Sequence, residues 1–285
     1  MTGGEQDGFR AVELPGGLRL LVGISGDGPL LVLLHGLTGT GQAWGDDVLG
    51  ALAERFRVAA VDLPGHGGSP VPGPASQWPF HRVVESLAAL PRLLGYGSAA
   101  WIGYSMGGRL ALAVAVEHPG VVASLSVEGG SPGIESEPER VERRLADDRL
   151  AAELETRGIE RFVELWERLP LFSSQSALDA SVRGEVRRRR LAQDPTGLAW
   201  ALRSMGTGRQ PSYWEALPRL SSPVTLVVGA LDEKFVGINQ RMMELLNNGR
   251  LEIVQGVGHT VHLEAPREWL RRVVPTSVDG EGVGG

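Results

Sequence analysis

The 285-residue sequence contains no cysteine. This absence excludes disulfide bonds, thiolate metal ligands and a cysteine nucleophile, and it leaves the redox compartment open. The stretch from Met1 to Arg10 has neither the basic start nor the apolar segment of a secretory signal. No apolar run reaches the roughly 18 residues that a membrane span requires. We therefore expect a protein of the cytoplasm without a membrane span.

An excess of positive charge is also lacking, because 28 Lys and Arg residues stand against 34 Asp and Glu residues, a formal net charge of -6. This balance argues against a surface for nucleic acid, but it is compatible with a local basic pocket for an anionic substrate. Hydrophobic residues make up 42% of the chain, as in ordinary globular proteins. No feature of the sequence points to an obligatory protein partner.

Short apolar runs rich in Val, Leu and Ile recur between helical stretches: Leu30 to Leu34, Val58 to Val61, Ala99 to Ile102, Val121 to Val127, Val224 to Val228 and Leu251 to Val254. This alternation predicts an α/β fold with a mostly parallel central sheet and helices on both faces. The segment Phe9 to Ile24 has two strand-like arms around Pro15-Gly16-Gly17, which predicts an antiparallel hairpin at one edge of the sheet.

The strand pattern disappears between Ser131 and Leu217, where the chain becomes helical and charged. We interpret residues 134–216 as a helical cap inserted between two core segments, 1–133 and 217–278. Ser136 and Glu139 have the spacing of a capping box and predict the start of the first cap helix. Further cap helices are expected over Ile159 to Arg168, Leu178 to Ala192 and Thr196 to Met205. The glycine-rich tail, 279–285, is expected to be disordered.

The segment Gly103-Tyr104-Ser105-Met106-Gly107 has G-x-S-x-G spacing between a predicted strand and a helical stretch from Arg109 to Val116. Glycines permit the sharp strand-to-helix turn that presents a serine hydroxyl at a helix N-terminus. This context predicts the nucleophile elbow of the α/β-hydrolase fold at Ser105. The alternative is a glycine-rich turn whose serine only caps the helix.

A serine hydroxyl needs a base, and the base needs a carboxylate that orients it. The fold places these residues in the order Ser, acid, His. His259 follows the last predicted strand and is the expected base, with His262 as its rival. Asp232 follows the strand Val224 to Val228 and is the expected acid, with Glu233 next. An aspartate in a turn before a helix is the structural alternative.

Two backbone amides are expected to form an oxyanion hole. One belongs to Met106, directly after the serine, and the other to Leu37, in the loop that follows the first parallel strand. Their side chains contribute little to this role.

Further segments resemble one branch of the fold, the 2-succinyl-6-hydroxy-2,4-cyclohexadiene-1-carboxylate synthases of menaquinone biosynthesis. The resemblance covers most of the chain, and it rests on Gly103 to Arg109, Val127 to Gly133, Trp166 with Leu169-Pro170-Leu171-Phe172, Met205 to Gly208 with Gln210-Pro211, and Asp232 to Phe235. It implies that pyruvate is eliminated from an enolpyruvyl-cyclohexene dicarboxylate, with Ser105 as a base that His259 polarises. It implies neither a metal nor an organic cofactor.

The substrate that the resemblance implies is a small anionic polycarboxylate, and arginine binds carboxylates through two parallel hydrogen bonds. The motif positions imply that substrate contacts come from Tyr104, Arg109, Arg143, Trp166 and Arg190. Arg143 belongs to a charged cluster that is also typical of a solvated helix face. Arg190 ends the run Arg187 to Arg190, so a neighbouring arginine could take its role.

Two other readings use the same residues. A carboxylesterase or carbon–carbon-bond hydrolase would use the serine covalently, because the fold supports many chemistries. Buried cap arginines would argue against it, since neutral esters offer them no counter-charge. A non-catalytic receptor on a hydrolase scaffold is a different class of protein, and the intact set of Ser105, Asp232 and His259 argues against it.

Overall fold

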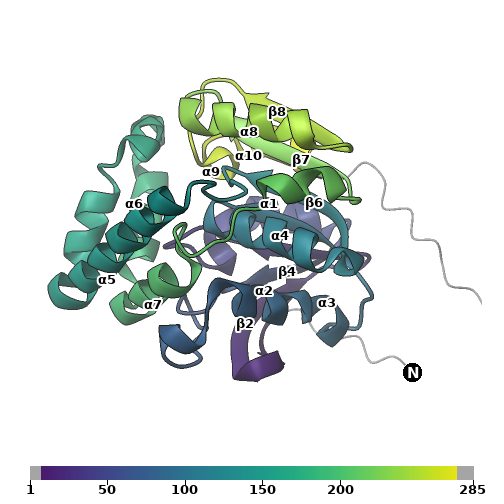
Figure 1. The fold of residues 1–285 in the computed structure, drawn as a ribbon. Helices are drawn as coiled ribbons and strands as arrows, with labels where there is room; N and C mark the ends of the chain where they lie inside the picture. The colour runs from purple at the N-terminus through teal and green to yellow at the C-terminus, as the bar shows by residue number, and fades with distance from the viewer. Residues whose placement is uncertain (1–7, 275–285) are drawn as a thin grey trace, which may run out of the picture.

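The structure is a computed structural model that describes residues 8–274, so the tail expected at 279–285 lies outside the described residues. Figure 1 shows a twisted sheet with helices on both faces and a group of helices to one side. The sheet strands are β1 (Gly8–Leu14), β2 (Leu18–Ser25), β3 (Leu30–Leu34), β4 (Arg57–Val61), β5 (Ala99–Tyr104), β6 (Val122–Glu128), β7 (Val224–Gly229) and β8 (Gly249–Val254). All the predicted strands are confirmed.

Within the described residues the sheet has eight strands in the order β1-β2-β4-β3-β5-β6-β7-β8. The first two strands form the predicted antiparallel hairpin, with Leu14 opposite Leu18, and β2 also pairs antiparallel with β4. Every other neighbouring pair is parallel. The prediction of a sheet that is mixed at one edge and parallel beyond it is therefore confirmed. The parallel strands end at a common edge, which gathers the loops after them.

Two apolar layers cover the two faces of the sheet. The helices around the sheet are α1 (Asp46–Ala53), α2 (Phe80–Ala88), α3 (Leu90–Leu93), α4 (Met106–Glu117), α8 (Glu233–Leu245), α9 (Val261–Glu264) and α10 (Pro266–Val273). One layer packs α2, α3, α4 and α8 on the sheet, around the fully buried Leu110. The other packs α1 and α10 on the opposite face, around the fully buried Trp269. The strands are apolar on both sides because both faces are covered.

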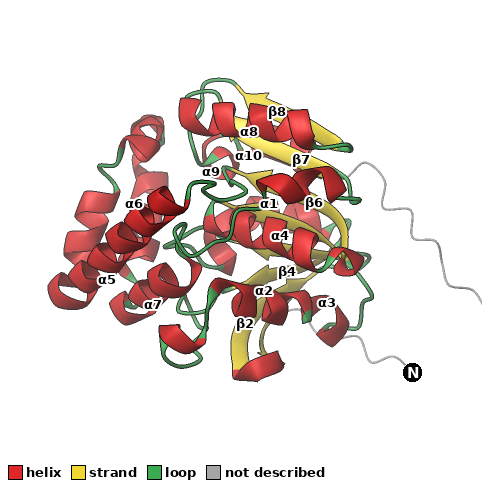
Figure 2. Ribbon diagram, in the orientation of Figure 1, coloured by secondary structure: helices red, strands yellow, loops and turns green. Residues whose placement is uncertain are grey.

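The segment between β6 and β7 contains α5 (Glu137–Trp166), the 3₁₀ helix η5 (Pro170–Ala177), α6 (Ala180–Leu191) and α7 (Pro195–Met205). Ser136 caps α5 through Glu139 N, as the sequence predicts. The helix expected from Ile159 continues α5 beyond a break at Gly158, where φ is +78°. Helices α5 and α7 share an apolar cluster, against which Leu191 of α6 packs. The cap helices stand beside the sheet (Figure 2). The limits of the cap, 134–216, stay a prediction.

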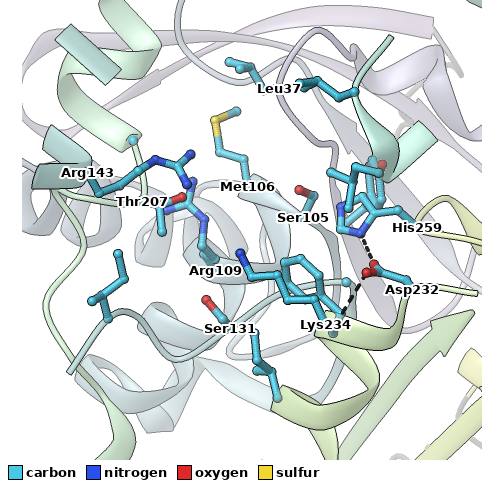
Figure 3. Close-up of a pocket in the computed structure, with 18 of the residues that line it drawn as sticks. Leu37, Ser105, Met106, Arg109, Ser131, Arg143, Thr207, Asp232, Lys234 and His259 are labelled. Atoms are coloured by element: carbon cyan, nitrogen blue, oxygen red, sulfur yellow. Dashed lines mark hydrogen bonds and ion pairs between the residues drawn. The ribbon is translucent and has the colours of Figure 1, made fainter. Parts of the chain in front are cut away.

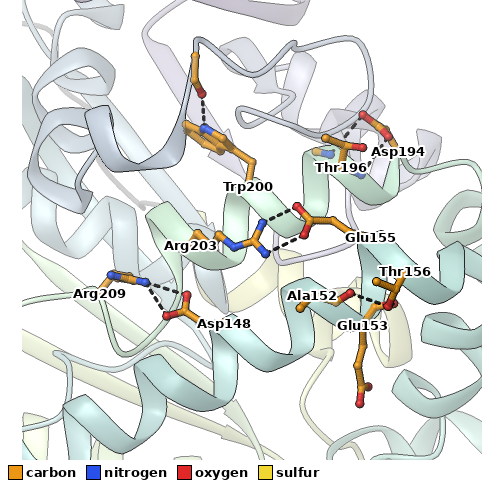
Figure 4. Close-up of polar contacts among 12 residues, drawn as sticks. Asp148, Ala152, Glu153, Glu155, Thr156, Asp194, Thr196, Trp200, Arg203 and Arg209 are labelled. Carbon is orange, nitrogen blue, oxygen red and sulfur yellow. Dashed lines mark hydrogen bonds and ion pairs between the residues drawn. The ribbon is translucent and has the colours of Figure 1, made fainter.

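Ion pairs tie the cap helices together (Figure 4). The Arg203 guanidinium on α7 donates to both carboxylate oxygens of Glu155 on α5, one of them at 2.8 Å. Arg209, which follows α7, donates to both carboxylate oxygens of Asp148 at 2.7 and 2.9 Å. Between residues 8 and 274 no helix combines the length and the apolarity that crossing a membrane requires.

Candidate active site

A cavity of about 850 Å³ lies between the cap and the strand ends of the sheet. Every residue that the sequence predicts for the site, except Arg190, lines it: Leu37, Tyr104, Ser105, Met106, Arg109, Arg143, Trp166, Asp232 and His259. Figure 3 shows Arg109 and Arg143 on one side of this cavity and His259 with Asp232 on the other, with Ser105 between them. The arrangement places cations opposite a histidine–carboxylate pair.

Ser105 stands at a strained turn between β5 and α4, with φ +50° and ψ −107°. A non-glycine residue keeps such a conformation only where the surrounding structure holds it in place. The turn is tight because two glycines flank it: a Cβ on Gly107 would lie 2.0 Å from the Leu34 carbonyl oxygen, and one on Gly103 would lie 2.3 Å from the Gly107 carbonyl oxygen. The Ser105 amide donates to the Glu128 carbonyl oxygen at 2.8 Å.

His259 and Asp232 form a buried pair, with 2.6 Å between His259 Nδ1 and Asp232 Oδ2. Because Nδ1 faces the carboxylate, His259 Nε2 is the ring nitrogen left for another partner. Ser105 Oγ borders the same cavity, but within the described chain no hydrogen bond joins it to His259. The two rivals lie elsewhere: Glu233 is exposed at the start of α8, and His262 Nδ1 contacts Glu128 at 2.9 Å.

Several residues that the sequence analysis did not assign hold the His259 segment. The Glu264 carboxylate accepts from the amides of Gly258 and Thr260, at 2.8 and 3.2 Å. Glu128, which is 1% exposed, accepts from both the amide and the ring of His262. Gly129 lies against the His259 ring, where a Cβ would come within 2.7 Å of Cε1. Glu128 and Gly129 belong to the Val127 to Gly133 motif, whose role no spacing rule predicts.

The amides of Leu37 and Met106, which the sequence predicts as an oxyanion hole, belong to residues at the cavity. Both residues line the cavity beside Ser105. Met106 is the first residue of α4, so its amide has no partner within the helix. Leu37 follows β3, and in residues 8–274 its amide donates no backbone hydrogen bond. Two backbone donors are therefore available to a ligand oxygen.

Arg109 is a buried cation whose hydrogen bonds, within residues 8–274, go to neutral groups. It is 8% exposed, and its guanidinium donates to the Met205 carbonyl oxygen at 2.8 Å and to Gln210 Oε1 at 3.2 Å. Burial, together with the charge of Arg143, lowers the pKa of Arg109 to about 10, and Asp147 offsets part of this. Within the described residues no carboxylate forms an ion pair with Arg109. A buried charge without an ion-pair partner is costly, so we expect a ligand at this position to be anionic.

Arg143 and Trp166 reach the cavity from α5. Arg143 Nε donates to the buried carboxylate of Asp147 at 2.8 Å, while the Arg143 side chain stays 44% exposed. The Trp166 ring stacks on Phe162 at 5.2 Å between centroids, and among the described residues its indole N–H has no acceptor. Asp147, also among the cavity-lining residues, was not predicted, because its contact with Arg143 reads in sequence as an ordinary helix pair.

Arg190 lies behind the cavity wall. It is buried, contacts Glu167 at 3.2 Å, and stands 5.1 Å from the ring centroid of Phe172, which itself lines the main cavity. Two smaller cavities border Arg190. The structure thus does not bring Arg190 into the main cavity with Arg109 and Arg143.

Comparison with known proteins agrees with this architecture. The profile of a family described as alpha/beta hydrolase fold matches residues 29–266. The chain is 41% identical over 237 residues to a candidate 2-succinyl-6-hydroxy-2,4-cyclohexadiene-1-carboxylate synthase of Bacillus subtilis (strain 168), covering 83% of this chain and 86% of that protein. It is 32% identical over 246 residues to the synthase of that name from Salmonella paratyphi B, covering 84% and 89%.

A solved structure gives the same result. MenH from S. aureus superposes with a TM-score of 0.81 at 33% identity, over 95% of this chain and 96% of that one. The family match and the sheet order define the chain as a member of the α/β-hydrolase family. Within it, the chain belongs to the 2-succinyl-6-hydroxy-2,4-cyclohexadiene-1-carboxylate synthases, the menaquinone-pathway lyases, and is accordingly an enzyme.

Proposed function

We propose that this enzyme eliminates pyruvate from 2-succinyl-5-enolpyruvyl-6-hydroxy-3-cyclohexene-1-carboxylate and releases 2-succinyl-6-hydroxy-2,4-cyclohexadiene-1-carboxylate. The observation that carries the proposal is Arg109, a buried guanidinium without a carboxylate partner in the described chain, one helical turn after Ser105. A substrate with several carboxylates supplies the charge that this position lacks. The family membership supports the same reaction.

In this reaction Ser105 Oγ removes the proton from ring carbon 2, which carries the succinyl group, while His259 Nε2 takes the hydroxyl proton. The C–H electron pair forms the bond between carbons 2 and 3. The existing double bond shifts to carbons 4 and 5, and the bond from carbon 5 to oxygen breaks. The departing enolate takes a proton and becomes pyruvate. Asp232 holds His259 in the tautomer that leaves Nε2 free.

Removal of this proton moves negative charge onto the succinyl carbonyl oxygen. The Leu37 and Met106 amides are proposed to bind that oxygen, because fixed dipoles aimed at developing charge stabilise a transition state without reorganising. Arg109 and Arg143 are proposed to bind ring-side carboxylates, with Tyr104 and Trp166 as walls. Arg190 is proposed to bind a remote carboxylate, which requires Phe172 to move. The proposed route uses no metal, organic cofactor or covalent acyl-enzyme.

The alternative is ester or carbon–carbon hydrolysis with Ser105 as a covalent nucleophile. The same residues allow it, since the triad geometry does not separate the chemistries. A neutral ester, however, leaves Arg109 without a counter-charge, so the elimination fits the cavity better.

The test is to incubate the purified protein with the enolpyruvyl substrate and to follow pyruvate release together with the absorbance of the conjugated diene. We expect both products in equal amounts, and a loss of several orders of magnitude in Ser105→Ala and in His259→Ala. The double variant should lose little more than either single variant, because the two residues act as one unit. Diene formation that survives in Ser105→Ala would contradict the proposed base.

A further inference from the structure

Gln175 is a buried residue of η5 whose side chain leaves the cap and enters the core. The four residues from Leu171 to Ser174, directly before it, line the substrate cavity. Gln175 itself is 8% exposed, and its Nε2 donates to Thr260 Oγ1 at 3.0 Å. The same short segment therefore forms a wall of the cavity and contacts the residue that follows His259.

The neighbours of Gln175 fix the orientation of its amide. Arg190 NH2 donates to Gln175 Oε1 at 3.3 Å. A guanidinium carries only donors, so the amide oxygen has to face Arg190 and the amide nitrogen has to face Thr260. Thr260 Oγ1 consequently accepts a hydrogen bond from Gln175, and this contact has a defined direction.

Thr260 Oγ1 also contacts the Tyr104 hydroxyl at 2.9 Å. Burial raises the pKa of Tyr104, so its phenol stays protonated and either hydroxyl can donate. Thr260 is covalently next to His259, and Tyr104 is covalently next to Ser105. A single polar chain thus runs from Arg190 through Gln175 and Thr260 to the immediate neighbours of both Ser105 and His259.

We propose that Gln175 and Thr260 are positioning residues that hold Ser105 and His259 in place relative to the cavity wall formed by Leu171 to Ser174. The proposal rests on the proposed function for the roles of these two partners. Neither side chain touches the substrate. Both act through Thr260 and Tyr104, which are joined by the backbone to His259 and Ser105. Leu171 to Ser174 and Gln175 belong to the same 3₁₀ helix, η5. A substrate that fills the cavity therefore contacts the helix that positions His259. Correct filling of the cavity and correct alignment of the pair are thereby linked.

The chain offers a matched control in Gln193. This glutamine also lies in the cap and is buried, and its Oε1 accepts from the Gly67 amide of the core at 3.2 Å. The loop around Gly67 carries none of the residues proposed for the site. Gln175→Met and Gln193→Met each keep most of the side-chain volume and each remove one cap-to-core hydrogen bond. They differ in whether that bond reaches the Ser105 and His259 pair.

The experiment measures kcat and KM on the enolpyruvyl substrate for both variants and for Thr260→Val. We expect Gln175→Met to lower kcat about three- to tenfold with little change in KM, as the loss of its hydrogen bond to Thr260 predicts. Gln193→Met should keep the wild-type kcat. The double variant Gln175→Met with Thr260→Val should lose less than the product of the single losses, because the two residues share one contact. Thermal unfolding of each variant shows whether it is folded.

A second readout needs no substrate. A fluorophosphonate probe reacts with an activated serine: the oxygen–phosphorus bond forms, fluoride leaves, and the hydroxyl proton passes to the histidine. Gln175→Met should react several-fold more slowly than wild type, and Gln193→Met at the wild-type rate. If wild type reacts with the probe but does not convert the enolpyruvyl substrate, the proposed function fails while the probe rates still decide the positioning role. Equal effects of Gln175→Met and Gln193→Met, an effect on KM alone, or an unreactive wild-type serine would overturn the proposal.

Discussion

His259 Nδ1 and Asp232 Oδ2 lie 2.6 Å apart, although 26 residues separate the two in sequence and they belong to loops after different strands. The neighbouring parallel strands β7 and β8 bring these loops together, since both end at the same edge of the sheet. Asp232 also accepts from the Phe235 amide at 3.4 Å at the start of α8. The start of α8 therefore holds the Asp232 carboxylate in the position from which it orients the imidazole.

We predict that Asp232→Asn lowers kcat at least about a hundredfold while the protein stays folded, because an amide can hold the imidazole in the wrong tautomer. Glu233→Gln is the matched control, since Glu233 is the adjacent carboxylate and is exposed. It should keep normal turnover. Steady-state kinetics and circular dichroism of both variants check this. Near-normal turnover in Asp232→Asn with a loss in Glu233→Gln would transfer the acid role to Glu233.

Gly129 supports a second prediction about His259. Its φ is +56°, and a Cβ there would lie 2.7 Å from His259 Cε1. Gly129→Ala should displace the imidazole and lower kcat at least about tenfold, in addition to a backbone cost of about 1–2 kcal/mol for a left-handed alanine.

The control for Gly129→Ala is Gly95→Ala. Gly95 has a φ of +87°, but a Cβ there meets no atom within 4 Å. This variant should show a similar loss of stability in urea unfolding and full activity. If Gly129→Ala keeps full activity, or if both variants lose activity in proportion to stability, the ring contact is unimportant.

The sequence was sufficient to predict the sheet and to select residues that share one cavity, among them Ser105, Asp232 and His259. Apolar runs mark the strands. Ser105, Asp232 and His259 can each be recognised locally, because each follows closely after a predicted strand. The supporting contacts could not be predicted because their partners are distant in sequence: His262 meets Glu128, and Gln175 meets Thr260 85 positions away. The burial of Arg190 behind Phe172 also escaped prediction, since a run of four arginines is typical of an exposed helix face.

A third prediction concerns pH and His35, a buried residue beside the proposed oxyanion loop. The Leu63 amide donates to His35 Nε2 at 3.0 Å, so Nδ1 carries the proton and faces the Gly36 carbonyl oxygen at 2.7 Å. Burial lowers the pKa of His35 to about 4. Between that value and the ordinary value of about 6.5, the unfolded chain binds a proton that the folded chain does not. Stability is therefore expected to fall as pH drops from about 6.5 toward 4.

His35→Gln keeps an acceptor for Leu63 and removes this titration. We expect it to lower stability at pH 7.5 but to flatten the pH dependence between pH 6.5 and 5 by about 1 kcal/mol per pH unit. His81→Gln is the control, because His81 is exposed, and it should leave the slope unchanged. Urea unfolding at four pH values measures the slopes. An unchanged slope in His35→Gln would show that other groups control the acid sensitivity.

The last prediction separates the anionic-substrate lyase from a neutral-ester hydrolase, and it uses the arginines of the cavity. If Arg109 and Arg143 bind substrate carboxylates, then Arg109→Met and Arg143→Ala each remove a charge-assisted contact worth about 1.5–3 kcal/mol. This corresponds to a loss of about tenfold to more than a hundredfold in kcat/KM on the enolpyruvyl substrate. On a neutral p-nitrophenyl ester the loss should be small. The control is Arg161→Ala. Arg161 is an exposed arginine of the same helix as Arg143 and pairs with Glu164. This variant should leave kcat/KM unchanged on both substrates.

The two cavity arginines should also differ from each other. Arg143 is partly exposed and already paired with Asp147, so it is expected to bind ground and transition states alike and to affect mainly KM. Arg109 is buried one turn from Ser105 and is expected to lower kcat as well, because it lies close to the charge that grows during the reaction. Steady-state kinetics on both substrates give the two constants. Equal losses on the anionic substrate and on the ester, or no loss on either, would refute carboxylate binding by these arginines and favour ester hydrolysis.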